Sequence, residues 1–377
     1  MRFPTGRRHG DLLVLFMALL SIYFSQCCAS KRKETKRDLL SVPSLQEDVK
    51  SSTVMRHTVA LRRPPSKNIS LAMLASPSFG RPVHFGLATN VKDEPRLREW
   101  LVYHRLIGFE HILVFDNESG GNLAAELSDL PFVRVIRAVG SKVKRWTTID
   151  AVLYFRGRAD WMLYLDADEV FVPQGEMNVS SFIESFGDGV GQVSVPWLPF
   201  GSSWRIKSPP GSLLLAYQRR HGLVAKTVKS FVRLEAMRHL PNDPHHFRIS
   251  NKWKWIFASG EQTKVHILSP EQRESYPSSG AFIAHFMSQS WEDLWLRKGS
   301  RRDDFFGSRR PLHVLAQLWS AHNEVHDPIL NSWGEHVKGL LNLPDNEPAP
   351  TVPMEAPTTA PTIKPQIVNA SAQCPCS

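Results

Sequence analysis

The stretch that decides the fold reads WMLYLDADE, residues 161–169, and consists of a continuous apolar run that ends in acidic residues. Five consecutive apolar residues predict a strand buried on both faces. Three similar runs precede it, and the segments between them have helical spacing. The sequence therefore predicts parallel strands joined by helices. The strands are expected at Val83–Ala88, His111–Phe115, Phe132–Ile136 and Trp161–Leu165. One helix is expected to start at a cap formed by Asp93, and two others to span Leu123–Leu127 and Thr147–Arg156.

Two of these strands end in acids at the edge where such sheets bind ligands, beyond their carboxyl ends. Asp116 ends the second strand, and Asp166 and Asp168 follow the fourth. In extended backbone, residues two apart project to the same side, where two carboxylates repel each other unless a cation or proton lies between them. The pattern favours a site for Mg²⁺ or Mn²⁺, with a solvated turn as the alternative interpretation.

The positive charge of the chain is concentrated near its N-terminus. Residues 1–70 hold 13 Lys/Arg and 5 Asp/Glu, against 33 and 31 in residues 71–377. A nucleic-acid-binding protein would need its basic excess on the domain that contacts phosphates, so we expect no nucleic-acid partner. The four cysteines lie at Cys27, Cys28, Cys374 and Cys376. Metal ligands between them must therefore be oxygen or imidazole groups.

The N-terminal segment predicts entry into the secretory pathway. Residues 12–24, LLVLFMALLSIYF, follow three arginines, as in a secretory signal or a signal anchor. A buried helix of the main domain is the alternative interpretation. We expect a single-pass type II protein of the Golgi or ER membrane with a lumenal catalytic domain, or a secreted one if the signal is cleaved. The basic flank at residues 31–37 opposes this orientation, whereas the sequons at Asn68, Asn117, Asn178 and Asn369 favour it.

Composition divides the rest of the chain. We expect a signal or anchor in residues 1–29, a basic, proline-containing stem in 30–81, one folded domain in 82–340 and a Pro/Thr-rich disordered tail in 341–377. No internal repeat is present. The domain is long enough for one large α/β enzyme.

Short motifs between residues 83 and 300 extend this interpretation. They are Lys92-Asp93-Glu94, Glu99-Trp100, Tyr103-His104 with Gly108, Asp116-Asn117-Glu118-Ser119, Trp161 through Phe171, Trp197 through Ser203, Lys229-Ser230, His245-His246 and His285-Phe286 through Lys298. Their order resembles that of GT-A fold glycosyltransferases, and is most similar to family 2-like and family 92-like members. The resemblance implies a Rossmann-like nucleotide-diphospho-sugar transferase fold, with a mixed, mostly parallel sheet flanked by helices.

The resemblance also implies a nucleotide-sugar donor, UDP- or GDP-linked, and a glycan or glycoconjugate acceptor. The donor's nucleotide would lie near Asp93, Glu94 and Asp116, and a divalent metal would bridge its diphosphate to Asp166 and Asp168. His285 is the candidate third metal ligand, with a satisfied core histidine as the alternative. Carboxylate-held Mn²⁺ or Mg²⁺ would neutralise the charge that develops on the leaving nucleotide.

An inverting hexosyl transfer needs a carboxylate near the acceptor hydroxyl to take its proton. Glu235, Asp243, Glu292 and Asp293 are candidates, and Glu292 is our choice, because Asp293 is expected to form a capping pair with Ser290. Two other functions remain open. One is a catalytically inactive carbohydrate-binding or scaffold protein of the same fold, and the other is a metal-dependent phosphohydrolase.

Overall fold

The computed structural model describes residues 83–361, apart from 141–142, 176, 242, 279, 301–308 and 352. The expected signal or anchor, the stem, Asn68 and Asn369 lie outside the described residues. Within the described ranges, no helix combines the length and the apolar character that crossing a membrane requires.

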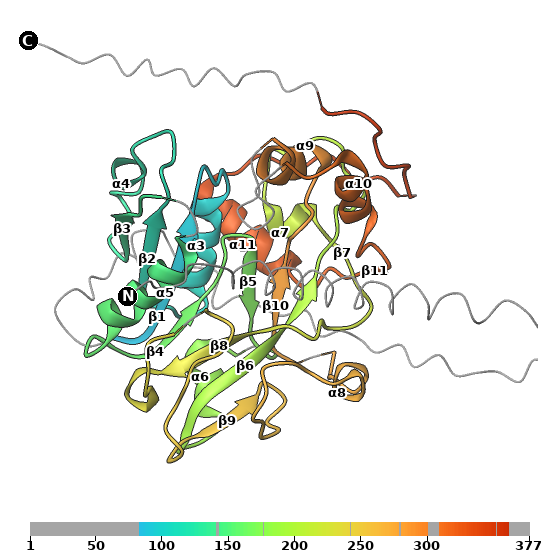
Figure 1. Cartoon of the computed structure of the whole chain (residues 1–377). Helices are drawn as coiled ribbons and strands as arrows, with labels where there is room; N and C mark the ends of the chain where they lie inside the picture. Colours follow the sequence, from blue (N-terminus) through green and yellow to red (C-terminus); the bar gives the residue numbers. More distant parts are fainter. Residues whose placement is uncertain are drawn as a thin grey trace, which may run out of the picture. The chain divides into compact units, whose positions relative to one another are not determined.

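The centre of the fold is a nine-stranded mixed sheet with the order β3-β2-β1-β4-β8-β6-β10-β5, in which β9 also pairs with β6 (Figure 1). Five of its pairings are parallel and three are antiparallel. The strands are β1 (Val83–Val91), β2 (His111–Asp116), β3 (Val133–Arg137), β4 (Ala159–Tyr164), β5 (Glu169–Val172), β6 (Val190–Pro199), β8 (Val228–Arg233), β9 (Lys254–Phe257) and β10 (Phe282–His285). The mixed, mostly parallel α/β fold predicted from the sequence is confirmed.

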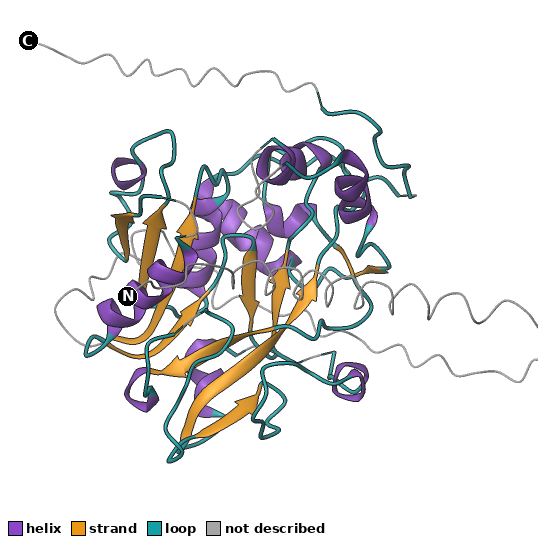
Figure 2. Cartoon of the chain, in the orientation of Figure 1, coloured by secondary structure: helices purple, strands orange, loops and turns teal. Residues whose placement is uncertain are grey.

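Helices flank this sheet, as Figure 2 shows. Helix α5 packs on β1 and β4, and α3 packs on β5 and α11. A separate two-stranded ladder pairs β7 (Arg219–Arg220) with β11 (Val325–His326). The helical elements are α3 (Leu97–Leu106), α4 (Leu123–Glu126), α5 (Lys144–Phe155), α6 (Val179–Glu184), α7 (Leu213–Ala216), η2 (Leu234–Ala236), α8 (Pro270–Glu274), α9 (Trp291–Leu294), the π-helical η3 (Trp295–Gly299), α10 (Leu312–Ser320) and α11 (Asn331–Leu341).

The four strands predicted from apolar runs all form. Strands β2 and β4 are almost completely buried, as expected, whereas β3 lies at the edge of the sheet and is only partly buried. Gly108 ends the turn after α3 with φ +114°, a conformation that glycine adopts without strain. The expected cap at Asp93 is wrong. Arg96 precedes the first turn of α3, and Asp93 instead lies in a left-handed turn with φ +48°, where its side chain binds the loop after β2.

The chain after α11 continues along the domain surface. Asn346 accepts a hydrogen bond from the backbone of Gly211 and donates one to the carbonyl of Ser212. Arg205 donates to the carbonyl of Glu347. These contacts fix residues 346–347 against the loop that precedes α7.

Candidate active site

The parallel register places the predicted acids at one edge of the sheet. Val91, the last residue of β1, pairs with Asp116, and Ala88 pairs with Tyr164 at the end of β4. Asp166 follows two residues later. The expectation that Asp116 and Asp166 share the carboxyl edge is therefore confirmed by the strand register.

A chain reversal brings His285 to the same edge. Strand β5 starts at Glu169 and pairs antiparallel with β10, so that Glu169 lies opposite His285. The Phe286 N–H also donates to the carbonyl of Asp168. As a result, Nε2 of His285 lies 3.7 Å from a carboxylate oxygen of Asp168. The His285 ring packs edge-on against Trp197, with 4.5 Å between ring centroids.

One face of α3 holds the start of β5 in place. The Trp100 indole N–H donates to the carbonyl of Glu169, and the Tyr103 hydroxyl donates to that of Phe171. His104 accepts the Phe171 N–H at Nε2 and contacts the Trp100 carbonyl through Nδ1. These side chains share a face because residues three and four apart are neighbours on a helix. The Glu-Trp and Tyr-His motifs thus position the strand that follows the acids.

Asp168 is nearly buried and paired with a guanidinium. Nη2 of Arg297, from η3, lies 2.7 Å from Asp168, and Nε of Arg297 lies 3.8 Å from Glu94. Burial alone would raise the pKa of Asp168, but Arg297 and His285 outweigh it and hold that pKa well below the ordinary value. Burial raises the pKa of Glu94, against the opposing effect of Arg297. Arg297 therefore carries a fixed positive charge at this edge.

Asp166 is paired with two lysines. Its carboxylate lies 2.6 Å from Nζ of Lys144 and 3.2 Å from Nζ of Lys229, which is fully buried and also lies 3.1 Å from Glu169. Burial opposes ionisation of Asp166, but Lys144 and Lys229 lower its pKa below the usual range. Burial raises the pKa of Glu169, and the Lys229 charge only partly offsets this. One oxygen of Glu169 is buried and has no hydrogen-bond partner among the described residues.

The three predicted metal ligands are therefore not gathered as one set: Asp168 faces His285, whereas Asp166 faces lysines. The separation of 3.7 Å between His285 and Asp168 is somewhat wider than that of neighbouring ligands on a cation with bonds of about 2.0–2.2 Å. The same Asp168 oxygen lies 2.7 Å from Arg297, so the pair would hold a divalent ion only after this arginine moved away. Asp166 would join it only by exchanging its lysine contacts.

The predicted nucleotide-binding residues border a small pocket. Its volume is about 250 Å³, and its lining includes Asp93 and Glu94. Asp93 accepts the Gly120 N–H at 2.8 Å, and Asp116 accepts the Ser119 N–H at 3.0 Å. Both carboxylates therefore shape the loop at this edge, and only Asp93 and Glu94 are among the lining residues.

The two acids of α9 differ in their surroundings. Asp293 is buried, accepts hydrogen bonds from the hydroxyls of Tyr217 and Ser290, and donates its N–H to Ser290, which confirms the expected capping pair. Glu292 is half-buried and accepts the Ser208 N–H at 2.8 Å. Asp293 is thus committed to the structure of the helix start.

Sequence reasoning missed the site roles of Lys144, Glu169 and Arg297, and noted Lys229 only as part of a motif. Lys229 interrupts an apolar strand, VKSFVR, and a charge inside a buried strand requires a counter-charge. That signal could have indicated a buried ion pair. Lys144 and Arg297 carry no comparable signal, because each lies beside other basic residues at the end of a helical segment, where a charge is ordinarily solvated.

Comparison with known proteins agrees with the motif order. No family model matches the chain. A glycosyltransferase family 92 protein of Ricinus communis is 27% identical over 188 residues, which are 47% of this chain and 34% of that protein. One of Oryza sativa subsp. japonica is 26% identical over 178 residues, or 45% and 30% of the two chains. The resemblance to family 92 glycosyltransferases is confirmed, and the matched region spans about a third of these relatives' length.

Solved structures align only loosely. A 4-diphosphocytidyl-2C-methyl-D-erythritol synthase aligns with a TM-score of 0.30 and 16% identity, over 52% of this chain and 96% of that one. HddC of Yersinia pseudotuberculosis aligns with a TM-score of 0.25 and 11% identity, over 54% and 90%. These TM-scores are too low to bear on function, so the fold description rests on the strand register above.

Proposed function

We propose that this chain is a glycosyltransferase that moves a sugar from a UDP- or GDP-linked donor to a glycan or glycoconjugate acceptor in the Golgi or ER lumen, with inversion at the sugar. The observation that carries the proposal is the pairing of Asp168 with His285 and Arg297 at the carboxyl edge of the parallel strands. The similarity to family 92 glycosyltransferases supports the reaction class.

The donor's diphosphate requires positive charge beside the acids. Arg297, Lys298 and Lys144 supply that charge, and an arginine can bind a phosphate through two parallel N–H groups. Lys298 donates to the Met287 carbonyl, and burial lowers its pKa to about 8, although Asp168 opposes this shift. We place the nucleotide in the pocket beside Asp93 and Glu94, at the same edge.

Asp168 and His285 would hold a divalent cation once Asp168 is released from Arg297, with Asp166 as the third ligand after release from its lysines. When bound, Mn²⁺ or Mg²⁺ neutralises negative charge on the departing nucleoside diphosphate. A ligand set that includes imidazole favours Mn²⁺ over Mg²⁺. We therefore expect His285→Ala to reduce activation by Mn²⁺ more than activation by Mg²⁺.

Glu292 is the proposed general base. Among the described residues its carboxylate accepts the Ser208 N–H, whereas Asp293 is held by two side-chain hydroxyls. Glu292 belongs to the short helix that leads directly into Arg297. A carboxylate in this position would take the proton of the acceptor hydroxyl as the new glycosidic bond forms. Glu292→Gln should lower kcat by about 100-fold or more while donor binding persists.

The decisive experiment incubates the full chain with a panel of nucleotide sugars and oligosaccharide acceptors, with Mn²⁺, Mg²⁺ or a chelator, and detects products by mass spectrometry. We expect acceptor-dependent transfer from one donor. Asp168→Asn should abolish it. Asp160→Asn should preserve it, because Asp160 is an exposed acid at the opposite end of β4 and pairs with the surface residue His84.

The rival functions predict other products from the same assay. Donor hydrolysis without any acceptor dependence would indicate a phosphohydrolase. Saturable sugar binding without turnover, unaffected by Asp168→Asn, would indicate a binding or scaffold protein. Either outcome would overturn the proposed transferase activity.

A further inference from the structure

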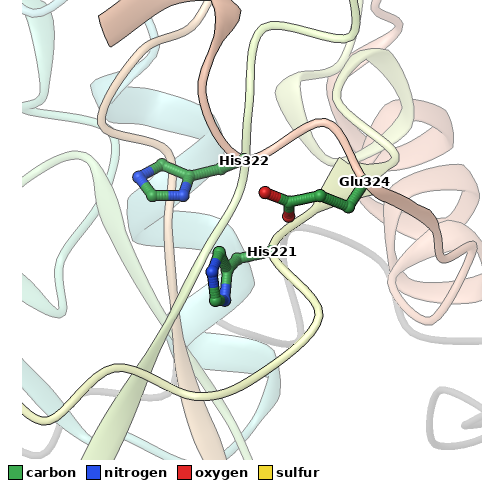
Figure 3. Close-up of side chains that lie close together, drawn as sticks. All are labelled: His221, His322 and Glu324. Atoms are coloured by element: carbon green, nitrogen blue, oxygen red, sulfur yellow. The ribbon is translucent and has the colours of Figure 1, made fainter. Parts of the chain in front are cut away.

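Two histidines and a glutamate converge at a place that takes no part in the site above. His221, His322 and Glu324 each offer a ligand atom, and these atoms all lie within 4.8 Å of one another. Figure 3 shows the Glu324 carboxylate directed toward the two imidazole rings, whose centroids are 5.5 Å apart. The three residues come from two segments about a hundred positions apart, so no spacing motif in the sequence indicates them.

One tautomer of His221 suits a metal ligand. Its Nδ1 lies 2.8 Å from the Leu223 carbonyl, and the Leu223 N–H can donate to the same nitrogen at 3.0 Å. In the tautomer whose Nδ1–H donates to that carbonyl, Nε2 carries the lone pair that a metal needs. Ligating histidines commonly donate their other ring N–H to a backbone carbonyl in this way.

His322 has an unsatisfied ring nitrogen. Its Nδ1 is buried with no hydrogen-bond partner in the described structure. Its backbone has φ +63°, the left-handed region that a residue other than glycine occupies at a cost. A buried orphan nitrogen on a strained residue is unfavourable unless another interaction compensates for it.

We propose that His221, His322 and Glu324 bind Zn²⁺, with the remaining coordination position open to water. Two imidazoles and one carboxylate are a donor set that suits Zn²⁺ and disfavours Mg²⁺, which prefers oxygen ligands. The guanidinium of the neighbouring Arg220 is paired with Asp327, and this pairing weakens its electrostatic repulsion of a bound cation.

The ion would cross-link two segments that the backbone joins only weakly. His221 directly follows β7 and Glu324 directly precedes β11, and this ladder consists of two residue pairs. The turn at His322 also packs tightly on Gly201, where an added Cβ would lie 2.5 Å from the His322 carbonyl oxygen. Because the Phe200 N–H donates to the His285 carbonyl, zinc would stabilise the chain that supports one wall of the candidate active site.

Metal analysis of the full chain tests the proposal. After dialysis against Zn²⁺ and then metal-free buffer, we expect about one tightly held zinc per chain by mass spectrometry, and a melting temperature raised by Zn²⁺ but not by Mg²⁺. His221→Ala/His322→Ala should lose both effects. The matched control is His246→Ala/His266→Ala, which removes another close histidine pair, with rings 4.4 Å apart, and should keep both.

Two further variants make the outcome decisive. Glu324→Gln alters an exposed side chain, so it should fold normally and weaken zinc binding at least tenfold even if the double-histidine variant does not fold. Asp168→Asn should retain the zinc. The proposal is overturned if zinc stoichiometry and affinity are unchanged in Glu324→Gln, if the zinc is lost in Asp168→Asn, or if the native chain binds no zinc at micromolar concentration.

Discussion

Lys229→Met removes a lysine that is fully buried beneath the candidate site. Its Nζ lies 3.1 Å from Glu169 and 3.2 Å from Asp166, and Glu169 is completely inaccessible to solvent. Removing one partner of a buried ion pair costs about 3–5 kcal/mol, because the other charge remains desolvated. Methionine preserves most of the side-chain volume, so the cost is electrostatic. In a domain of this size, the melting temperature should fall by about 10 °C.

Urea unfolding followed by tryptophan fluorescence measures this cost. Lys254→Met is the matched control, since Lys254 is an exposed lysine at the start of β9 and should change stability by less than about 0.5 kcal/mol. Adding Glu169→Gln to Lys229→Met should recover about 2 kcal/mol, because the buried acid then carries no charge. If Lys229→Met is as stable as the native chain, or if Glu169→Gln gives no recovery, the buried pair does not exist as described.

Three further predictions concern pH and location. His104 is buried and its pKa is lowered by burial to about 3, so below about pH 6.5 the unfolded chain gains a proton at this residue that the folded chain does not. From pH 7 to pH 5 this residue should cost about 2 kcal/mol of stability. In urea titrations, His104→Leu should reduce the fall by that amount, while His111 and His245, whose pKa values are lowered by burial to about 4, keep contributing to it. Burial lowers the pKa of Lys298 to about 8, so the affinity for the donor, measured by calorimetry, should fall above pH 8 in the native chain and stay constant in Lys298→Met. The stability of the native chain should instead rise with pH over that range, because the lysine of the unfolded chain keeps its proton. In secretory cells, Asn178, exposed at the start of α6, should carry a glycan and Asn117 at the sheet edge should not, and glycosidase treatment of Asn178→Gln should then give a smaller mass shift.

The strands and the acids at their ends could be predicted from the sequence because both are local signals. A continuous apolar run of five residues is favourable as a buried strand, and the acids after it then lie at the carboxyl end of that strand. The pairing of Asp168 with His285 is different, because it depends on β10 crossing the sheet to lie antiparallel to β5. Only the order of motifs pointed to His285, and the strand register supplies its physical placement.

The ion-pair partners of the basic residues in the site could not be predicted from the sequence. A lysine inside an apolar strand implies a buried counter-charge, so Lys229 predicts that a partner exists. It does not identify Glu169 or Asp166, because that choice depends on β8 lying beside β4 in the sheet. Arg297 is less predictable still, since an arginine on a short polar helix is ordinarily solvated. Charge pairing at this edge is therefore a property of the sheet order, and substitutions that test it must be chosen from the folded structure.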